Sequence, residues 1–478
     1  MMIAPCSVVR RAEQRAFAAG ITDSAALMDE VVQRLHRAVR QAGIAPQRVV
    51  VYAGTGNNAG DALGLAAALA CPVLLRCADA AQRLSPDSAR QLARCADLRV
   101  LDRAPEPQPH TLILDGLLGS GASGALRPAY AALCAEMNAL RAASPHSLLL
   151  AIDIPTGLDA ESGEGMGVRA DISCPIGCVK PGMVADAAVD AVGRIMPIPL
   201  PSCVLPDEGA GDRVLAPGEP LLQLPRRSYS CFKNRAGRVV VLAGSRGMLG
   251  AAQMAAEAAA AAGAGLVELC CRAEIYPLLA ARVAPEVMVR CVERYTELAA
   301  PQAQALLIGP GLGALTRAEA EALHRLAMRF AGSVVLDADG LNAVAAHGLS
   351  IGAHWILTPH PGEMRRLDPR PAASRREQLR RFVEEHGCTL LLKGARSLIG
   401  DRSCCVYNST GGPYMANGGQ GDVLAGVVAA LAAQGCQPLQ AAAAGAYHCG
   451  LAAERVWRRK GFAGVVRASE LLRELAVC

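Results

Sequence analysis

Short apolar runs alternate with Ala-rich segments of helical pattern along the chain. Most runs end in Gly, Asp or Pro, which is typical of buried parallel strands joined by helical crossovers. The pattern therefore predicts an α/β fold with parallel sheets. The runs are Arg48–Tyr52, Pro72–Arg76, Thr111–Asp115 and Leu148–Ile152 in the first half, and Arg238–Ala243, Leu266–Cys270, Ala305–Ile308, Ser333–Asp337, Trp355–Thr358 and Thr389–Lys393 in the second.

A Pro-rich segment, Ile195–Pro225, separates the two series of strands. Proline recurs there too often for a helix or a central strand. The 478 residues also exceed the roughly 250–300 at which a single core stops growing. We therefore predict two α/β domains, residues 1–210 and 225–478, joined by a linker over residues 211–224.

Composition narrows the classes of function. The chain has 48 Lys and Arg against 43 Asp and Glu, and only 3% of its residues are aromatic. The basic surplus is small and scattered, which argues against a nucleic-acid or membrane-surface partner. We expect small-molecule substrates instead. The sequence leaves the oligomeric state open, including a homo-oligomer.

The 18 cysteines are scattered through Ala- and Leu-rich stretches without a CxxC pair. We expect reduced core thiols and a cytoplasmic enzyme, because free cysteine behaves as a small buried hydrophobe. The start of the chain shows neither the basic region nor the apolar region of a signal peptide. Glu257 and Glu268 interrupt the most apolar stretch, so we expect no membrane span.

Three loops of the first half carry polar groups at predicted strand ends. Asn57, Asn58 and Asp61 follow the first strand in a turn that opens a helix, where unpaired N–H groups favour anions. Asp115 and the Asp153-Ile-Pro-Thr-Gly turn end two further strands. Such ends meet at one sheet edge, where ligands bind in open α/β folds. The alternative is a set of ordinary turns that use Gly and Asn for positive φ.

Residues 5–210 resemble the epimerase domain of the NAD(P)H-hydrate repair family, whose patterns are GxGNNGGDGL, DALFGTG and AVDIPSGL. The resemblance implies a Rossmann-like three-layer domain in which Asp153 and Lys180 (CVKPG) are catalytic. It implies a potassium ion on Asn58, Asp115 and Thr156. The substrate-binding residues that it implies are Asn57, Asn58, Ala59, Gly60, Asp61, Gly119, Ser120, Gly121, Ala122, Ser123, Gly124, Ala125 and Asp153.

The first domain departs from these patterns at two glycines, which are Ala59 and Ala62 here. If either alanine takes a positive φ, we expect a strain of about 1 kcal/mol. Thr156 replaces the usual Ser and keeps the hydroxyl. A degraded, structural or ligand-sensing first domain is the alternative to an active epimerase.

The second half carries a Gly-rich helix start, NGGQGD, in which Asp422 lies where backbone N–H donors converge. An acid there suits a general base that accepts a hydroxyl proton during phosphoryl transfer. A carboxylate that merely pairs with the helix dipole is the plain alternative. His360, between two prolines in LTPHPGE, and the KGARS loop follow other strands. The VLDADGLN run favours either a capped turn or a metal-phosphate site.

LIGPGLG, VLDADGLN, LTPHPGE and NGGQGD, in this order, resemble the ADP/ATP-dependent NAD(P)H-hydrate dehydratases, which have a ribokinase-like fold. The resemblance implies Asp422 as catalytic base, ADP or ATP as co-substrate, and Mg2+ on the nucleotide phosphates. The substrate-binding residues that it implies are Ala251, Gly313, His360 and Asp422. The nucleotide-binding residues are Lys393, Gly394, Ala395, Arg396, Ser397 and Gly421.

Together the resemblances predict a bifunctional enzyme for hydrated nicotinamide cofactors. The first domain would interconvert the R and S hydrates, and the second would phosphorylate the C6 hydroxyl of the S hydrate and eliminate phosphate. A small-molecule kinase with a ligand-sensing first domain is the alternative. The sequence does not decide between ADP and ATP, or between NADH and NADPH hydrates.

Overall fold

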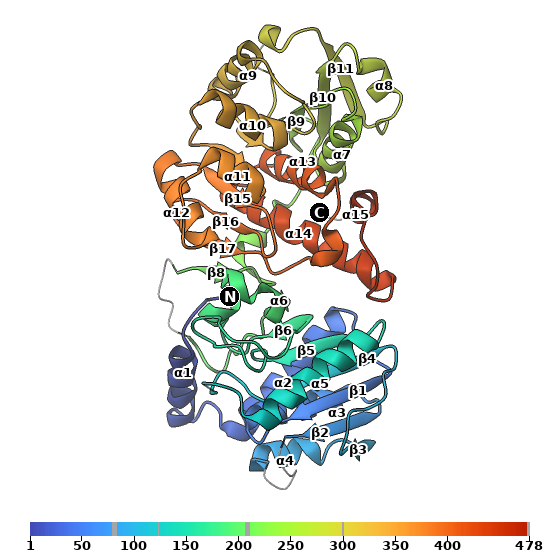
Figure 1. Cartoon of the computed structure of the whole chain (residues 1–478). Coiled ribbons are helices and arrows are strands. Elements are labelled where there is room, and N and C mark those ends of the chain that lie inside the picture. Colours follow the sequence, from blue (N-terminus) through green and yellow to red (C-terminus); the bar gives the residue numbers. More distant parts are fainter. Residues whose placement is uncertain (79–83, 123, 206–210, 299–300, 476–478) are drawn as a thin grey trace. The chain divides into compact units, whose positions relative to one another are not determined.

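The computed structural model describes residues 1–78, 84–122, 124–205, 211–298 and 301–475 (Figure 1). The chain divides into two compact units. The first comprises Met1–Ala216 with Lys460–Ala463, and the second comprises Pro217–Arg459 with Gly464–Cys478. The limits predicted for the domains and the linker stay a prediction.

The first unit is built on a sheet with the strand order β3-β2-β1-β4-β5-β6-β7, in which every neighbouring pair is parallel. The order is that of a Rossmann-like sheet. The strands of the unit are β1 (Arg48–Ala53), β2 (Val73–Cys77), β3 (Leu98–Val100), β4 (Thr111–Gly116), β5 (Leu148–Ile152), β6 (Ile172–Cys174), β7 (Arg194–Ile195) and the short β8 (Arg213–Val214).

Helices complete the α/β pattern of the first unit (Figure 1). They are α1 (Cys6–Ala18), α2 (Ser24–Gln41), α3 (Asn57–Ala68), α4 (Pro86–Leu92), α5 (Pro128–Ala143) and α6 (Val189–Val192), with 3-10 turns at Pro181–Val184 and Asp186–Ala188. Helix α3 packs between β1, β4, α2 and α4, and its central residues from Ala59 to Ala66 are buried.

The strand order of the first unit reverses direction between β1 and β4. Tyr52 pairs with Asp115, and Asp115 pairs with Ala151, so the carboxyl ends of β1, β4 and β5 are in register. Such a reversal opens a crevice at the carboxyl ends of the strands. The loops after these three strands therefore meet at one place.

The second unit has the strand order β11-β10-β9-β12-β13-β14-β15-β16-β17. Pairing is parallel up to β15, and the last two pairs are antiparallel. The strands are β9 (Arg238–Leu242), β10 (Leu266–Arg272), β11 (Val287–Val292), β12 (Ala305–Ile308), β13 (Ser333–Leu336), β14 (Trp355–Leu357), β15 (Thr389–Leu392), β16 (Leu398–Gly400) and β17 (Cys405–Tyr407).

The helices of the second unit include two that are almost wholly small and apolar, α7 and α13. The full set is α7 (Leu249–Ala261), α8 (Tyr276–Ala280), α9 (Arg317–Arg329), α10 (Ala338–His347), α11 (Pro361–Leu367), α12 (Arg375–His386), α13 (Gln420–Ala433), α14 (Pro438–Arg459) and α15 (Ala468–Glu474). The 3-10 turns are Pro220–Leu222, Tyr295–Glu297 and Pro413–Met415.

Helix α13 packs against α7 and α14 and covers β9, β12 and β13. The contact with α7 is very close: a Cβ placed on Gly426 would lie 2.2 Å from the carbonyl oxygen of Ala255 and 2.9 Å from the Cβ of Ala258. Small side chains thus fix the position of α13, whose first turn carries Asp422.

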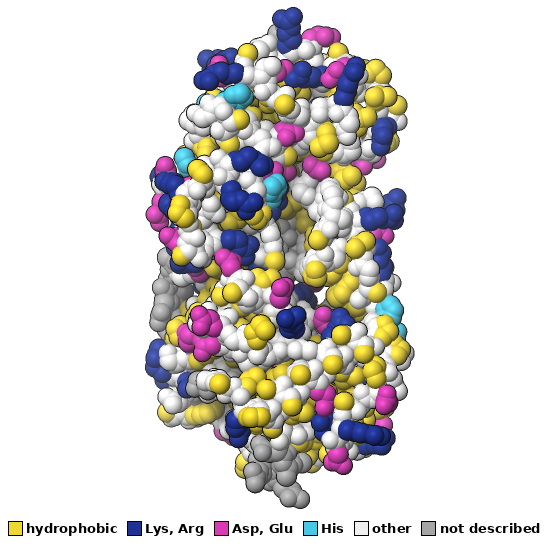
Figure 2. Space-filling view, in the orientation of Figure 1, with side chains coloured by type: hydrophobic (Ala, Val, Ile, Leu, Met, Phe, Trp, Pro, Cys, Tyr) yellow, Lys and Arg dark blue, Asp and Glu magenta, His cyan; other side chains and the backbone are white. Residues whose placement is uncertain are grey.

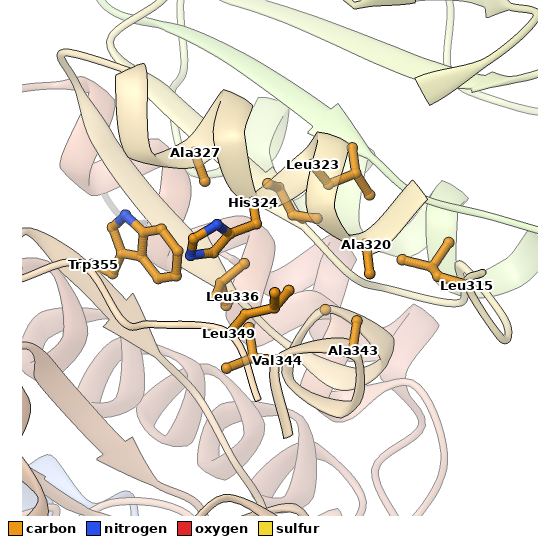
Figure 3. Close-up of a pocket in the computed structure, with 12 residues that line it drawn as sticks. Leu315, Ala320, Leu323, His324, Ala327, Leu336, Ala343, Val344, Leu349 and Trp355 are labelled. Atoms are coloured by element: carbon orange, nitrogen blue, oxygen red, sulfur yellow. The ribbon is translucent and has the colours of Figure 1, made fainter. Parts of the chain in front are cut away.

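A cavity of about 20 Å³ lies between α9, α10 and β13 (Figure 3). Apolar side chains such as Leu323 and Val344 line it, and the rings of His324 and Trp355 meet edge to face at its end. This volume holds about one water molecule. The cavity is a packing defect of the core and has no room for a substrate.

Several expectations from the sequence can be compared with these features. The α/β class with parallel sheets is confirmed, and all ten predicted strands are present to within a few residues of their ends. The prediction missed the short strands β3, β6, β7 and β8, and also β11, β16 and β17. No helix among the described residues meets the length and hydropathy of a membrane span.

The cysteines and surface charges can also be compared with expectation. Among the described residues every cysteine is a free thiol and most are buried, but Cys291 is exposed. On the face drawn in Figure 2, the coloured Lys and Arg side chains are interspersed with Asp and Glu.

Because the α7–α13 contact leaves no space at position 426, we expect Gly426→Ala to destabilise the second unit by about 1–3 kcal/mol. Scanning calorimetry should show its unfolding midpoint lowered by several degrees, at about 2–4 °C per kcal/mol. Gly250→Ala on α7 is the matched control, since its Cβ would meet only a Met254 methyl group at 3.8 Å. An unchanged midpoint for Gly426→Ala would contradict the packing described.

Candidate active sites

A cavity of about 590 Å³ opens at the crevice of the first unit. Loops after β1, β4 and β5 contribute to its wall, together with α1, α2 and α3. The predicted residues that line it are Asn57, Asn58, Asp61, Gly119, Ser120, Gly121, Ala122, Asp153 and Lys180. Of the other predicted residues, Ala59 and Gly60 are buried in α3, Gly124 and Ala125 are exposed outside the lining, and Ser123 lies outside the described residues.

Helix α3 begins at Asn57, earlier than the sequence suggested, so the Asn-Asn-Ala-Gly-Asp run forms its first turn. Its N-cap is Gly56, and no side chain caps the helix. Ala59 and Ala62 are helical and absent from the positive-φ residues, so the strain considered for them does not arise. The backbone N–H groups of this first turn face the cavity end of the helix, as an anion site requires.

Asp153 is held by three donors at the cavity wall. It pairs with the Lys180 ammonium and accepts hydrogen bonds from the Ser120 N–H (2.9 Å) and the Ile176 N–H (3.2 Å). Burial would raise the pKa of Asp153, but Lys180 and these donors hold it below its usual value. The carboxylate is therefore ionised. Its positive φ of 65° is sparsely populated for a non-glycine residue and marks a constrained position.

Lys180 is 1% exposed, and its ammonium also donates to the Ile176 carbonyl at 3.0 Å. Burial would lower the pKa of Lys180, yet Asp153 raises it overall. The two residues thus form a buried ion pair at the floor of the cavity.

The residues predicted as potassium ligands lie close to this pair. Asp115 accepts hydrogen bonds from the Thr156 N–H and hydroxyl, both at 2.7 Å, and from the Leu117 N–H at 3.2 Å. Burial raises the pKa of Asp115 to about 6. The third predicted ligand, Asn58, has its Nδ2 buried without a hydrogen-bond partner among the described groups, and its Oδ1 lies near Gly119 and Asp153.

Sequence reasoning missed the contribution of α1 to this site. Cys6, Val9, Arg10 and Glu13 of that helix line the cavity. The available signal was an amphipathic helix with Glu13 next to the buried positions Ala12 and Ala16. It carried no motif that pointed to a ligand.

In the second unit, the loops after β12, β13, β14 and β15 align because their strands are parallel and in register at Ile308, Leu336, Leu357 and Leu390. They carry a set of charged and glycine residues, which are Gly313, Asp337, His360 and Lys393. The N-terminus of α13 adds Gly421 and Asp422.

Lys393 connects these loops to α13. Its ammonium donates to Asp337 at 2.6 Å and lies 3.8 Å from Glu363. A Cβ on Gly421 would lie 3.3 Å from the same nitrogen and 3.9 Å from Asp337 Oδ2. Burial would lower the pKa of Lys393, but Asp337 and Glu363 raise it. The predicted nucleotide-binding lysine thus points to the acids beside Asp422.

Asp422 is the third residue of α13 and lies in the first turn of that helix. Burial raises its pKa to about 6, and the negative charge of Asp337 adds to the shift. A carboxylate with a pKa near neutrality is suited to general-base catalysis.

His360 caps α11. Its Nδ1 accepts hydrogen bonds from the N–H groups of Gly362 (2.9 Å) and Glu363 (3.3 Å), and its Nε2 lies 3.4 Å from Glu363 Oε1. Glu363 completes the cap by accepting the His360 N–H at 2.7 Å. The imidazole is about half exposed, with a relative exposure of 51%, so its outer edge is open to a ligand.

The remaining predicted residues lie on two loops of this unit and, for Ala251, in the first turn of α7. The Gly313 N–H donates to Asp339 at 2.8 Å, and Gly311, in the same loop, approaches Ala251. Gly394 and Ala395 are exposed, with the Ala395 carbonyl bonded to Arg375 at 3.0 Å. Arg396 has a φ of 51°, and the Ser397 hydroxyl donates to the Gly394 carbonyl at 3.3 Å. Within the described part of the chain, no group of three His, Cys, Asp or Glu side chains is arranged to hold a metal ion.

Two family models match the chain: "YjeF-related protein N-terminus" over residues 24–182 and "NAD(P)H-hydrate dehydratase" over residues 239–476. The chain is 33% identical to the bifunctional NAD(P)H-hydrate repair enzyme Nnr of Coxiella burnetii over 98% of this chain and 97% of that protein. It is 34% identical to the Moorella thermoacetica enzyme of the same name, over 88% and 85% respectively.

Among solved structures, a Bacillus subtilis ADP/ATP-dependent NAD(P)H-hydrate dehydratase co-crystallised with ATP and Mg2+ is 27% identical. It matches 53% of this chain and 93% of its own, with a TM-score of 0.46. The sequence relatives cover both units of the chain almost completely. The chain therefore belongs to the family of bifunctional NAD(P)H-hydrate repair enzymes, with an epimerase domain followed by an NAD(P)H-hydrate dehydratase domain.

Proposed function

We propose that the second domain uses ADP or ATP to phosphorylate the C6 hydroxyl of the S hydrate, with Asp422 as the general base. The position of Asp422 carries this proposal. Its carboxyl lies at the N-terminus of α13, beside Gly421 and near Lys393, with a pKa of about 6. A base that accepts the hydroxyl proton and a cradle for the phosphoryl group are thus next to each other.

The proposed reaction has two steps, phosphorylation of the hydrate and elimination of phosphate. Asp422 takes the hydroxyl proton while the C6 oxygen forms a bond to the terminal phosphorus of the nucleotide. The bond from that phosphorus to the bridging oxygen breaks with its electron pair on the leaving nucleotide, which is AMP from ADP or ADP from ATP. The C6–O bond then breaks with its electron pair on phosphate, and C5 gives a proton to water to form the C5–C6 double bond. Phosphate is a far better leaving group than hydroxide, which explains the need for a nucleotide in a net dehydration.

Neighbouring residues would position the reactants. Lys393, fixed by Asp337, would neutralise phosphoryl charge, and His360 with Gly313 and Ala251 would contact the hydrated nicotinamide. Gly394 to Ser397 would contact the nucleotide. Mg2+ is commonly held by substrate phosphates, waters and one or two carboxylates, so the absence of a three-residue metal group in the described chain is compatible with it. When bound, it would offset the negative charge of the phosphates.

For the first domain we propose that the crevice cavity binds the hydrates and interconverts their R and S forms. The volume of about 590 Å³ suits a nicotinamide nucleotide moiety. The Asp153–Lys180 pair would fix the polar edge of the ring. Asp115 and Thr156 offer buried oxygens that fit a potassium ion, since Asp115 carries its charge against a burial penalty. The ion would supply a compensating charge.

The proposed base predicts a large effect of Asp422→Asn. In a coupled assay with S-NADH hydrate and ADP or ATP, followed at 340 nm, we expect kcat to fall by about 10²–10⁴-fold. Glu321→Gln on the surface of α9 is a matched control and should keep full activity. A rate for Asp422→Asn near that of the unmodified chain would contradict the assignment, and no NADH from the unmodified chain would favour a different kinase substrate.

The raised pKa of Asp422 predicts the pH dependence of dehydration. A general base works only when ionised, so kcat should be constant above pH 7 and fall about tenfold per unit below pH 6. Initial rates at saturating substrate between pH 5 and 8 measure this fall in kcat. If the residual activity of Asp422→Asn still falls below pH 6, a group other than Asp422 is responsible for the fall.

The buried pair of the first domain predicts a stability effect. Lys180→Met leaves Asp153 buried without its partner, which costs about 3–5 kcal/mol. Lys180→Met combined with Asp153→Asn removes both charges and should recover much of this loss. Scanning calorimetry of the first domain tests the difference, and equal losses in the single and double variants would argue against a compensated ion pair.

A further inference from the structure

Asp61, in the first turn of α3, is a buried carboxyl that lines the crevice cavity and has no hydrogen-bond partner among the described residues. Its side chain is 8% exposed and lines the cavity wall. No described group donates a hydrogen bond to it, and burial is the largest influence on its pKa, which is raised well above the ordinary value. A raised pKa favours the protonated form of a carboxyl, which can donate a proton.

Glu13 of α1 is another carboxyl in this cavity and the candidate for a counterpart. It lines the same cavity, is partly exposed, and interacts electrostatically with Asp61 and Asp153. Burial raises the pKa of Glu13 too, and Asp153 adds to the rise. Like Asp61, Glu13 receives no hydrogen bond from the described residues. Two carboxyls that interact in one cavity ionise stepwise, so the ionisation of one disfavours the ionisation of the other.

Asp153 differs from this pair in its chemistry. It accepts three hydrogen bonds, including the one from Lys180, and stays ionised. Its lone pairs are engaged and its proton affinity is low, so it is a poor proton donor and a poor acceptor. The cavity thus contains one anchored carboxylate and two carboxyls whose oxygens are open to a ligand.

We propose that Asp61 and Glu13 are the general acid and general base of the epimerisation, and that Asp153 with Lys180 only positions the substrate. This inference rests on the proposed epimerase function of the first domain. It assigns the proton transfers to a residue of α1 and one of α3.

The hydrate is a hemiaminal, because C6 carries both the hydroxyl and the ring nitrogen. Asp61 donates its proton to the C6 hydroxyl, the C6–O bond breaks with its electron pair on oxygen, and water leaves. The nitrogen lone pair forms the C6=N1 bond of an iminium ion. Water then adds to the opposite face of C6 and gives a proton to Glu13. Proton exchange between Glu13 and Asp61 restores the starting state, and no oxidant or nucleotide is needed.

The charged groups around the pair are few. Glu13 interacts with Asp153, Lys180, Arg10 and Cys203, and Asp61 interacts with Glu13 and Asp153. On α2 and α4, which also pack against α3, Asp29 pairs with Arg90, and with Arg94 just beyond α4. The pH profile of epimerisation should therefore follow Asp61 and Glu13.

The test compares Asp61→Asn, Glu13→Gln and the exposed control Asp190→Asn in the full chain. Purified R-NADH hydrate is incubated without nucleotide, and the R and S forms are separated by chromatography between pH 5 and 9, with the uncatalysed rate subtracted. We expect the two carboxyl variants to lose about 10²–10⁴-fold in rate and Asp190→Asn to stay at the unmodified rate.

The pH profiles separate catalysis from a structural role. The unmodified rate should fall at low pH, where Glu13 is protonated, and at high pH, where Asp61 is ionised. Glu13→Gln should lose the low-pH fall and Asp61→Asn the high-pH fall. A rate within about threefold of the unmodified chain, with both limbs retained, overturns the proposal.

Two controls complete the test: calorimetry shows whether each variant folds, and the unmodified chain shows whether the first domain is an epimerase. If calorimetry shows that Asp61→Asn does not fold, the profile of Glu13→Gln alone decides, and an unchanged profile again overturns the proposal. An unmodified chain that leaves the epimer ratio unchanged refutes the epimerase function itself. If the unmodified chain and both variants are all active, the epimerase function stands and only the roles given to Asp61 and Glu13 are refuted.

Discussion

In each domain a lysine ammonium, buried in the first and half-buried in the second, lies at the carboxyl edge of a parallel sheet and pairs with an aspartate that follows a strand. Lys180 pairs with Asp153 in the first domain, and Lys393 pairs with Asp337 in the second. An unpaired buried charge would cost several kcal/mol, so each pair fixes the loops that supply its two members. The substrate-facing groups of both sites are arranged around these pairs.

Each site also contains a further carboxyl, Asp61 in the first domain and Asp422 in the second, whose environment raises its pKa. Asp61 is buried and Asp422 is half-buried, each near other acids and neither a member of the close ion pair, so the pKa of each is raised. A carboxylate held in an ion pair and a carboxyl with a raised pKa within one site suit proton transfer near neutral pH. The two domains arrive at this arrangement with different sheets and different helices.

The sequence was sufficient for the parallel strands and for the residues at their ends. Strands such as Leu148–Ile152 are continuous apolar runs. Asp153 and Lys393 follow such strands directly, and His360 lies shortly after β14. Short strands such as Arg194–Ile195 carry no such run and were missed. Helix α1 was missed as part of a site because its contact with the crevice is a long-range tertiary contact. The partner of Lys393 was likewise unpredictable, since Asp337 lies 56 residues away in the chain.

The central claim is that the hydrate's own C6 hydroxyl becomes the phosphate ester oxygen before it leaves. The most direct measurement uses S-NADH hydrate labelled with ¹⁸O at C6, the full chain and unlabelled nucleotide, with mass spectrometry of the released inorganic phosphate. The account predicts that each phosphate released carries one ¹⁸O atom from the hydrate. Unlabelled phosphate together with labelled water would contradict it, because the hydroxyl would then have left without being phosphorylated.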